Sequence, residues 1–446
     1  MRHTTHAPLA AAGALCIGLT ALAGPLNPPA GPVASTHKTL TEVEPRIAIN
    51  AVNTPGDADS LFKITQRGSY YLTGNITGVA ARHGIEIAAS DVTLDLMGFE
   101  LAGVAGGEIA SLDGISATAG PNVTGITVRN GTVRRWGGDG VDLRSATQCT
   151  VTGVFSGGFI GGENLGDGIA VGTSSVVSNS GACNNEGNGI VAGTSCIITS
   201  CTSKLNTRNG IDTDSGTLIS NCSTDNNGQD GISAGSVCAI TACTSYLNGG
   251  DGFAVGSNGT ITGCTAGHNT GNGVTGFSNC TITGCTSSQN VGHGVSVFTA
   301  SQITASSAHS NAASGISVGS GSTVSNCVAN ANDLDGIVAS ASCLILANTC
   351  SINGNAGDGA GIHTTDTDNR IEGNTCTSQD RGIDVDIPGN FIVKNTCSGN
   401  TFNWTIAANN VCGPILDRSA PASAAINGNS APSSLGTTDA NANFTQ

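Results

Sequence analysis

The sequence is poor in aromatic residues and in charge. Aromatic side chains make up 3% of its 446 residues and charged side chains 11%, with 16 Lys or Arg against 31 Asp or Glu. The net charge of −15 opposes binding to nucleic acid, anionic lipid and polyuronate chains, although bound Ca²⁺ would reverse the last of these conclusions locally. So few aromatic rings also leave few platforms for a sugar to stack on. We therefore expect no nucleic-acid partner.

Long hydrophobic runs are also missing. The one uncharged apolar stretch of note, Leu9 to Leu22, follows a basic start and is shorter than the roughly 20 residues of a membrane span. Small residues end it before Gly24. This pattern predicts a signal peptide over residues 1–23, no membrane span, and a secreted, periplasmic or cell-surface location.

A 21-residue repeat runs from Asp167 to Asn353. In lines of 21 residues, one column is always Asn, a second is always Gly, and the residue after each Gly is apolar. The Asn column is Asn185, Asn206, Asn227, Asn248, Asn269, Asn290, Asn311, Asn332 and Asn353. The Gly column is Gly168, Gly189, Gly210, Gly231, Gly252, Gly273, Gly294, Gly315 and Gly336. Units this short cannot bury their own core, so they must stack into a solenoid.

The residues between these columns indicate which solenoid forms. Short Ile and Val runs separated by Gly, Asn, Asp and Ser clusters are typical of short strands joined by turns. Scarce Leu argues against leucine-rich repeats, and Gly and Asn in every unit argue against a coiled coil. We predict an all-β, right-handed parallel β-helix with three strands per coil and coils about 4.8 Å apart. Stacked Asn amides would bond to one another, and the Gly column would serve a positive φ or a crowded backbone.

The repeat extends less regularly at both ends. Ile85, Ile115 and Val141 precede the regular units, and Ile362, Ile383 and Ile406 follow them, which predicts 15 coils. The longer early coils place loops around residues 102–113, 117–123 and 155–164. The predicted organisation is a signal peptide (1–23), a Pro-rich lead and N-terminal cap (24–80), the β-helix (81–410) and a C-terminal tail or cap (411–446).

Most of the 17 cysteines follow the repeat as well. We interpret both Cys columns as inward-facing, small apolar fillers. Stacked thiols are favoured, while disulfides between neighbouring coils stay an alternative. No metal site is expected, because the Cys spacing follows the coil and no His accompanies it. The columns are Cys201, Cys222, Cys243, Cys264, Cys285 and Cys327, and Cys196, Cys238, Cys280 and Cys343.

Two charged clusters are the candidate substrate-binding sites. In the first, Trp136 would stack on a sugar ring while an Arg binds a carboxylate or abstracts a proton. Alternatively, Trp136 covers a coil corner and the Arg side chains pair with Asp139 and Asp142. The candidate residues are Arg129, Arg134, Arg135, Trp136 and Asp139 in the first cluster, and Arg381, Asp384 and Asp386 in the second.

Several segments carry a resemblance to known proteins: GPLNPPAGPVAST (24–36), DADSLFKI (57–64), GSYYLTGN (68–75) and VTLDL (92–96). Together with the Gly-Ile coils, they resemble the pectin-lyase-like β-helix superfamily and, within it, an uncharacterised group of exported bacterial β-helix repeat proteins. The resemblance implies fold and export. The superfamily includes lyases, hydrolases, epimerases, tailspikes and adhesins, so it does not decide the function. Gly292-His293-Gly294 is similar to a tripeptide of polygalacturonase-like hydrolases, but His293 falls in a column of Asp and Asn.

Two functions follow as hypotheses. The first is a non-catalytic extracellular or surface rod for attachment or glycan binding, because the repeat is uniform and the catalytic motifs match poorly. The alternative is a polysaccharide lyase or glycoside hydrolase acting in a groove along the helix. No cofactor is expected, except Ca²⁺ in the case of a lyase. Aligned Thr rows would also suit ice binding by resemblance, although Thr is simply a good strand residue.

Overall fold

The computed structural model describes residues 44–104, 112–118, 123–158, 161–355, 357–417 and 438–446. The chain divides into two compact units, Met1–Pro45 and Arg46–Gln446, and all the strands lie in the second. The predicted signal peptide, almost all of the Pro-rich lead and the centres of the three predicted loops lie outside the described residues. Within those residues there is no helix that is long and apolar enough to cross a membrane.

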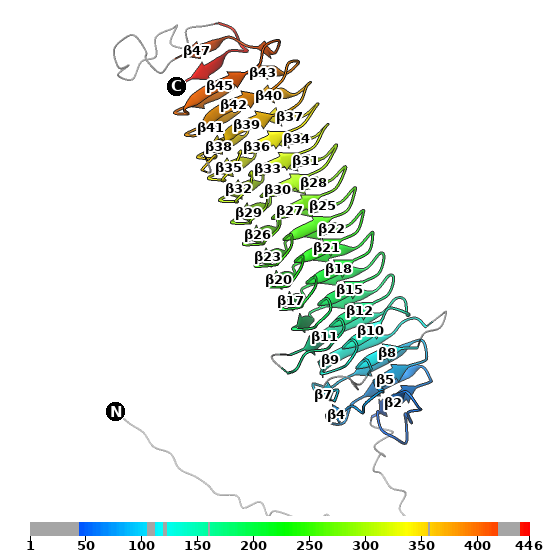
Figure 1. The fold of residues 1–446 in the computed structure, drawn as a ribbon. Coiled ribbons are helices and arrows are strands. Elements are labelled where there is room, and N and C mark those ends of the chain that lie inside the picture. Colours follow the sequence, from blue (N-terminus) through cyan, green and yellow to red (C-terminus); the bar gives the residue numbers. More distant parts are fainter. Residues whose placement is uncertain (1–43, 105–111, 119–122, 159–160, 356, 418–437) are drawn as a thin grey trace, which may run out of the picture. The chain divides into compact units, whose positions relative to one another are not determined.

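The second unit is the predicted parallel β-helix, in which each regular coil adds one strand to a 16-stranded sheet and two to a 32-stranded sheet (Figure 1). The strands of the 16-stranded sheet are β2 (Ser60–Ile64), β5 (His83–Ile87), β8 (Ile115–Ala117), β10 (Val141–Leu143), β12 (Ile169–Val171), β15 (Ile190–Ala192), β18 (Ile211–Thr213), β21 (Ile232–Ala234), β24 (Phe253–Val255), β27 (Val274–Gly276), β30 (Val295–Val297), β33 (Ile316–Val318), β36 (Ile337–Ala339), β39 (Ala360–Thr364), β42 (Arg381–Val385) and β45 (Phe402–Ile406).

The strands of the 32-stranded sheet are β1 (Ile47–Ala48), β3 (Gly68–Tyr71), β4 (Ile76–Thr77), β6 (Val92–Asp95), β7 (Glu100–Ala102), β9 (Thr127–Arg134), β11 (Thr150–Gly157), β13 (Val176–Ser178), β14 (Gly181–Cys183), β16 (Ile197–Thr199), β17 (Thr202–Lys204), β19 (Leu218–Ser220), β20 (Ser223–Asp225), β22 (Ala239–Thr241), β23 (Thr244–Tyr246), β25 (Thr260–Thr262), β26 (Thr265–Gly267), β28 (Thr281–Thr283), β29 (Thr286–Ser288), β31 (Gln302–Thr304), β32 (Ser307–His309), β34 (Thr323–Ser325), β35 (Val328–Asn330), β37 (Leu344–Leu346), β38 (Thr349–Ser351), β40 (Arg370–Glu372), β41 (Thr375–Thr377), β43 (Phe391–Val393), β44 (Thr396–Ser398), β46 (Val411–Cys412), β47 (Ile415–Asp417) and β48 (Asn443–Thr445).

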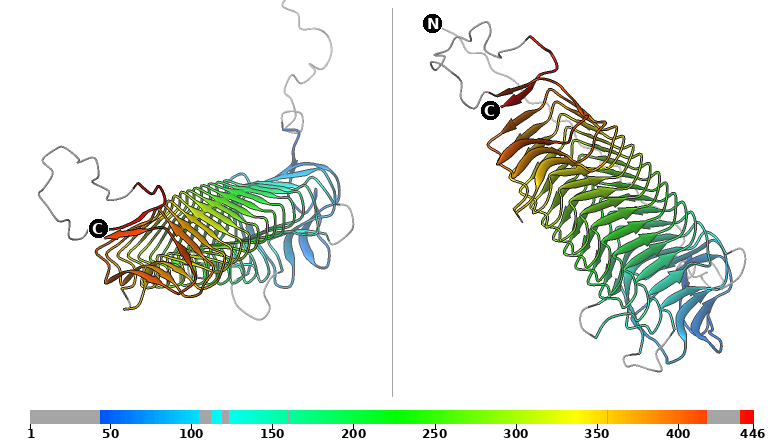
Figure 2. Two further views of the ribbon diagram at one scale, coloured as in Figure 1. Left: turned by 90° about the horizontal axis from the view of Figure 1, so that it is seen from above. Right: turned by 45° about the horizontal axis from the view of Figure 1, so that its top comes forward.

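The pairing register follows the 21-residue period. Phe253 pairs with Val274 and Ile261 with Ile282, so equivalent residues of successive coils lie side by side, and Figure 2 shows the resulting stack from two further directions. The 16-stranded sheet has one rung more than the predicted 15 coils. The additional rung is β2, in which Phe62 pairs with Ile85, upstream of the first residue that we counted.

The core is a column of aliphatic side chains inside the coils. Ile232, Phe253, Val274 and their counterparts are fully buried, as the apolar column predicts. Each such side chain contributes about 1.5–3 kcal/mol of burial free energy. Successive side chains of a strand point to opposite faces, so the middle residue of each three-residue strand in the 16-stranded sheet faces outward.

The Asn column forms the predicted amide ladder. Asn248 donates from both its backbone N and its Nδ2 to Oδ1 of Asn269, at 3.0 Å each, and Asn269 repeats this with Asn290. The ladder continues past the nine predicted members. Asn164 donates to Asn185 at one end, and Asn353 donates to Oε1 of Gln379 at the other.

The Gly column is explained by crowding. None of its nine glycines has a positive φ. A Cβ on Gly252 would lie 2.6 Å from the carbonyl oxygen of Gly273 and 2.8 Å from Nδ2 of Asn269. Of the two explanations that the sequence left open, the structure therefore selects the close approach between neighbouring coils and the ladder.

The cysteines face inward as predicted, but they are more than apolar fillers. None of the sixteen cysteines among the described residues forms a disulfide. The backbone N–H of Cys222 donates to Sγ of Cys243 at 3.4 Å, and that thiol donates in turn to the carbonyl oxygen of Thr241. Ser306 and Asn348 accept the equivalent N–H bonds elsewhere in the column. The column therefore selects small side chains that accept a backbone hydrogen bond at a coil corner.

Each corner of a coil turns through one left-handed residue. In the coil of β24–β26 these are Asn258, Gly263 and His268, with φ of 60°, 61° and 55°. The same positions elsewhere hold Val237 and Ile352, β-branched residues that rarely adopt this conformation. The corner geometry thus overrides local preference at these two sites.

Strand pairing continues at both ends. Near the N-terminus, β2 and β3 pair in parallel with β5 and β6. Near the C-terminus, β46 pairs with β43, and β48 pairs with both β44 and β47. The described parts of the predicted cap and tail therefore add strands to the two sheets.

Candidate functional site

The outer face of the 16-stranded sheet has a polar column along the side where its strands begin. Each Asp or Asn of this column accepts a hydrogen bond from the backbone N–H of its counterpart in the next coil. Oδ1 of Asp230 accepts from Asp251 at 2.7 Å, and Oδ1 of Asn272 accepts from His293 at 2.7 Å. His293 is a member of this second ladder, and burial lowers its pKa. The sequence indicated the column but not its hydrogen bonds.

Along the other side of this face runs the carboxyl-edge row, which we define as the residues that directly follow the inward-facing ends of the strands. Pairing of Thr213, Ala234, Val255 and Gly276 places the residues after them in register. From β10 to β42, the row is Arg144, Gly172, Gly193, Asp214, Gly235, Gly256, Phe277, Phe298, Gly319, Ser340, Thr365 and Asp386.

Arg144 is the first charged residue of the row and lies among three carboxylates. Its guanidinium contacts Asp139 and Asp167, and its Nη1 lies 3.6 Å from Oδ1 of Asp142. Burial raises the pKa of Asp139 to about 6, although Arg144 opposes the shift. These ion pairs link the two edges of the same sheet face. Because three carboxylates surround one guanidinium, the four side chains together carry a negative charge.

Beside Arg144 the face is hollowed. A cavity of about 240 Å³ is lined by Arg144, the glycines of the row at 172 and 193, Asp212 and Asp214, among others. We call it the glycine hollow. It forms because the row carries no side chain on the two coils between Arg144 and Asp214.

Further along the row, two phenylalanines stack on each other. Phe277 and Phe298 are 50% and 53% exposed, and their rings lie 5.2 Å apart at 16°. Their neighbours in the row are Gly256 and Gly319, so the outward face of each ring is not covered by a side chain of the row. A Cβ on Gly256 would lie 2.6 Å from the backbone N of Ser236, which explains the glycine there.

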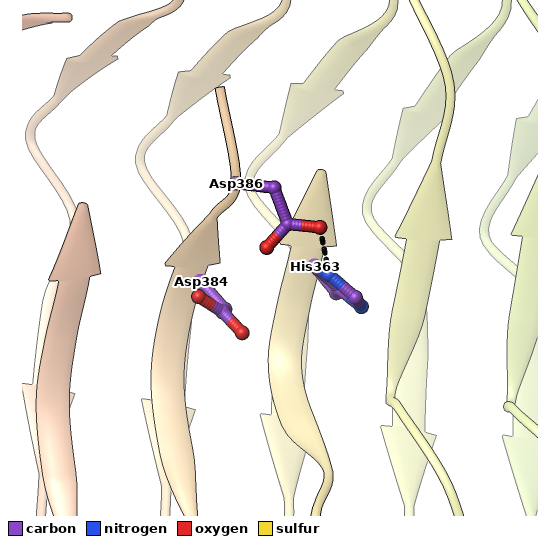
Figure 3. Close-up of side chains that lie close together, drawn as sticks. All are labelled: His363, Asp384 and Asp386. Atoms are coloured by element: carbon purple, nitrogen blue, oxygen red, sulfur yellow. Dashed lines mark hydrogen bonds and ion pairs between the residues drawn. The ribbon is translucent and has the colours of Figure 1, made fainter. Parts of the chain in front are cut away.

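Near the C-terminal end, His363 lies between two carboxylates. Its Nδ1 is 3.2 Å from Oδ2 of Asp335, and its Nε2 is 3.0 Å from Oδ2 of Asp386, the contact drawn in Figure 3. Asp384, on β42, is buried beside them, and its Oδ2 lies 3.0 Å from Nε of Arg381. Arg381 also pairs with Asp358 at 2.7 Å.

This cluster unites the three predicted residues Arg381, Asp384 and Asp386 with His363 and Asp335, which sequence reasoning missed. Donor atoms of His363, Asp384 and Asp386 lie within 4.8 Å of one another, so these are side chains that could coordinate a metal ion. Aligning the coils in register would have revealed His363, because it occupies the position of β39 that is equivalent to Asp384 of β42.

The ion pairs of His363 predict a pH-dependent stability. The hydrogen bond that the imidazolium of His363 donates to Asp335, opposed by burial, raises the pKa of His363 from 6.5 to about 9. A raised folded-state pKa means that this stabilisation is complete below pH 6.5 and is lost as the pH rises through 9. We expect wild type to exceed His363→Gln in melting temperature below pH 6.5, with the difference shrinking towards pH 9. A difference that is independent of pH would contradict the ion pairing.

The first predicted cluster is divided between two faces. Arg129 and Arg134 lie on β9 of the 32-stranded sheet, whereas Asp139 lies beside the other sheet. Arg129 pairs with Asp95 at 3.0 Å, and Arg134 makes two bonds to Glu100 at 2.8 and 2.9 Å. The pairing with Asp139 and Asp142 that the structural interpretation expected is made by Arg144, the last arginine of this charged stretch, and not by Arg129 or Arg134. The substrate-binding role predicted for these residues stays a prediction.

Trp136 requires a correction. It is 1% exposed, and its Nε1 donates to the carbonyl oxygen of Leu101 at 3.2 Å. Its ring fills space left by glycines at 78, 84 and 114, where an added Cβ would come within 3.0 Å of ring atoms. A sugar cannot stack on a buried ring, so the stacking role predicted for Trp136 is excluded.

Arg134 and Arg135 nevertheless line a second cavity. It has a volume of about 400 Å³ and also includes Glu100 and Phe155. The ion pair with Arg134 lowers the pKa of Glu100. Nε of Arg135 donates to the carbonyl oxygen of Gly161. Because both guanidinium groups are engaged in these contacts, this cavity offers less free charge than the sequence suggested.

A family model described as "Right handed beta helix region" matches residues 167–304, 211–349 and 274–430. These ranges together cover more than half of the chain. The chain belongs to the right-handed β-helix family. Coils of this β-helix outside the matched ranges continue the same two sheets. No curated protein matches the sequence significantly.

Solved structures resemble this β-helix only distantly. The A-module of the Azotobacter vinelandii mannuronan C-5 epimerase AlgE4 is 15% identical, with a TM-score of 0.40 over 78% of this chain and 91% of that chain. The Dettilon tailspike protein (gp208) is 18% identical, with a TM-score of 0.39 over 69% and 59%. The periplasmic alginate epimerase AlgG is 11% identical, with a TM-score of 0.35 over 76% and 81%. Similarities this weak say nothing about function.

Proposed function

We propose that this β-helix is an exported, non-catalytic rod that binds a glycan along the carboxyl-edge row, at the cell surface or outside the cell. Export is supported by the predicted signal peptide over residues 1–23. The observation that carries the proposal is the exposed Phe277–Phe298 pair. It places two of the chain's few aromatic rings together on the sheet face that also holds the glycine hollow and the His363 cluster.

The geometry of the pair suits a sugar ring. Apolar C–H faces of pyranose rings pack on aromatic rings, while their hydroxyls need polar partners nearby. The rings of Phe277 and Phe298 cover each other on one side, so each offers one outward face above a neighbouring glycine. Ser296, the middle residue of β30, supplies a hydroxyl on the same face, whereas the hydroxyl of Thr275 on β27 is buried and accepts from Nδ2 of Asn272.

The charges of this face support binding more than catalysis. A general base must be deprotonated near the operating pH and free to reach its substrate. His363 is held protonated at neutral pH by two carboxylates, and Arg144 is shared among three. These carboxylates can accept hydrogen bonds from sugar hydroxyls. A polysaccharide lyase or hydrolase that uses the Arg381 cluster is the competing hypothesis.

Removing both rings tests the proposal. In a binding screen against immobilised polysaccharides, Phe277→Ala/Phe298→Ala should weaken the best interaction roughly 30-fold, since each stacking face contributes about 1 kcal/mol. Val291→Ala, which truncates another exposed apolar side chain (61% exposed), should leave binding unchanged.

An activity assay on the same polysaccharides distinguishes the binding proposal from the competing catalytic hypothesis. Incubation with the protein, with and without Ca²⁺, should release neither unsaturated uronate nor new reducing ends. Product formation that is lost in Arg381→Ala would replace the binding proposal with a catalytic one. Binding that is indifferent to both phenylalanines would refute the assignment of the site.

A further inference from the structure

We propose that His363, Asp384 and Asp386 form a binding site for a divalent transition-metal ion, with Zn²⁺ as the representative case. The site lies near the C-terminal end of the β-helix, where Asp386 closes the carboxyl-edge row as we defined it. Such a site is independent of the proposed glycan binding, because the metal ion is itself the ligand.

The donor atoms of the three side chains converge. They all lie within 4.8 Å of one another, and Nε2 of His363 is 3.0 Å from Oδ2 of Asp386 (Figure 3). A tetrahedral ion that is held at 2.0–2.2 Å by each ligand requires donors about 3.4 Å apart. His363 and Asp384 lie on the paired strands β39 and β42, whereas the side chain of Asp386 is 47% exposed and can adjust to complete the geometry.

Asp384 supplies a second, independent observation. It is 3% exposed, yet in the part of the chain that the structure describes its carboxylate accepts no hydrogen bond. Its one short contact is with Nε of Arg381 at 3.0 Å, and this buried Nε itself lacks a hydrogen-bond partner. Burial raises the pKa of Asp384, although Arg381 and His363 oppose the shift. Buried carboxylates are ordinarily paired and hydrogen-bonded or coordinate a metal ion, so an ion beside His363 would satisfy this one.

The orientation of His363 is that of a metal-binding histidine. Its Nδ1 is 3.2 Å from Oδ2 of Asp335, which leaves Nε2 to face Asp386. A histidine that binds a metal ion through one ring nitrogen ordinarily donates the other N–H to a carboxylate or carbonyl oxygen, which fixes the ring. Asp335 is anchored in turn, since its Oδ1 accepts from the backbone N–H of Ala360 at 2.8 Å. Asp335 is therefore a positioning residue of the site.

The charge of the cluster favours a divalent ion over a proton. The carboxylates of Asp335, Asp384 and Asp386 surround His363, and Arg381 is the guanidinium in contact with them. A metal ion on Nε2 displaces its proton to solvent and brings two positive charges in place of one, which balances the charges of these side chains. One imidazole with carboxylates suits Zn²⁺ or Co²⁺, whereas Ca²⁺ takes 6–8 oxygen ligands.

Metal binding would cross-link neighbouring coils. His363 lies on β39, Asp384 lies on β42, and Asp386 follows β42 directly. Because the three ligands come together only in the folded chain, the ion stabilises that chain by mass action. Three protein ligands leave a fourth coordination position for water.

Titration of the chelator-treated protein with metal ions tests the site. Visible absorption of Co²⁺ reports its coordination, and calorimetry with Zn²⁺ gives affinity and stoichiometry. The ligand variants are His363→Gln, Asp384→Asn and Asp386→Asn, of which the last changes an exposed side chain and leaves the core intact. The matched control is His309→Gln, which removes a half-buried imidazole from β32 of the other sheet. Thermal melts establish that each variant is folded.

We expect the protein to bind one equivalent of Zn²⁺ or Co²⁺, and to bind Ca²⁺ far more weakly. The affinity for Zn²⁺ should fall at least about 100-fold in His363→Gln and Asp386→Asn, and roughly tenfold in Asp335→Asn, which keeps the acceptor for Ala360. His309→Gln should bind as wild type does. Saturating Zn²⁺ should raise the melting temperature of wild type and of the control, but not of His363→Gln.

Three outcomes would overturn the site: no stoichiometric binding of Zn²⁺, equal affinity of His363→Gln and wild type, or Co²⁺ absorption that is unchanged in Asp386→Asn. Ca²⁺ binding as tight as Zn²⁺ binding and indifferent to the imidazole would show only a charged surface, and would overturn it as well. None of these results bears on the proposed glycan binding, which is tested separately through Phe277 and Phe298.

Discussion

Replacing Asn269 with alanine is expected to destabilise the β-helix by about 3–5 kcal/mol. Its Oδ1 accepts both donors of Asn248, and its Nδ2 donates to Asn290, all at 3.0 Å. The residue is fully buried, so no water can replace these bonds. The backbone N–H of Asn248 would lose its acceptor, and its Nδ2 would keep only Oγ of Ser245. Oδ1 of Asn290 would keep only the backbone N–H of residue 269. Urea unfolding followed by circular dichroism measures the change.

A matched control separates the ladder from the mere loss of an amide group. Gln229 carries its amide at an exposed position of the regular coils, and Gln229→Ala should alter stability by no more than about 0.5 kcal/mol. Because a stack of coils need not unfold in one step, hydrogen exchange should accompany the urea titration. Faster exchange confined to the coils adjoining Asn269 is the expected pattern. Equal stability of the two variants would show that the ladder contributes little.

The second large effect is expected for Gly252→Ala. The added methyl group would lie 2.6 Å from the carbonyl oxygen of Gly273 and 2.9 Å from Cβ of Ala266. Because one obstacle is backbone, neighbouring coils would have to separate, and overpacking of this kind costs typically 1–3 kcal/mol or more. We expect a loss of about 3 kcal/mol or insoluble expression, measured by thermal melting and soluble yield.

Gly263 provides the control for this prediction. An added Cβ there would meet nothing within 4 Å, although φ is +61°. Asn tolerates this conformation and occupies the equivalent corner as Asn221 and Asn326. Gly263→Asn should therefore preserve stability within about 0.5 kcal/mol. If Gly252→Ala were equally harmless, crowding would not explain the regular spacing of the column.

Features that depend on the repeat could be predicted from the sequence. The period places like residues in register, so the Asn ladder, the inward Cys columns and the three strands per coil follow from spacing alone. The reason for the Gly column did not follow, because positive φ and crowding select the same residue. The hydrogen bonds of the Cys corners were missed because thiols were treated as apolar fillers.

The candidate site was predicted less well, since it depends on which face each side chain occupies. Trp136 and Arg134 are close in sequence but end in the core and on the 32-stranded sheet. Phe277 and Phe298 were overlooked because the low aromatic content was taken as a property of the whole surface. Both follow their apolar repeat residue by three positions, so aligning that column would have revealed them.

The in-register pairing of these coils has an evolutionary consequence. Each 21-residue unit meets its neighbours through the same backbone bonds and the same Asn contact, so a duplication or deletion of one whole unit preserves both junctions. Between Asp214 and Phe277, a duplication would lengthen and a deletion would shorten the distance between the charged and the aromatic position by one strand spacing. Unequal recombination can therefore adjust the spacing of outward-facing residues along the carboxyl-edge row, in steps set by the backbone.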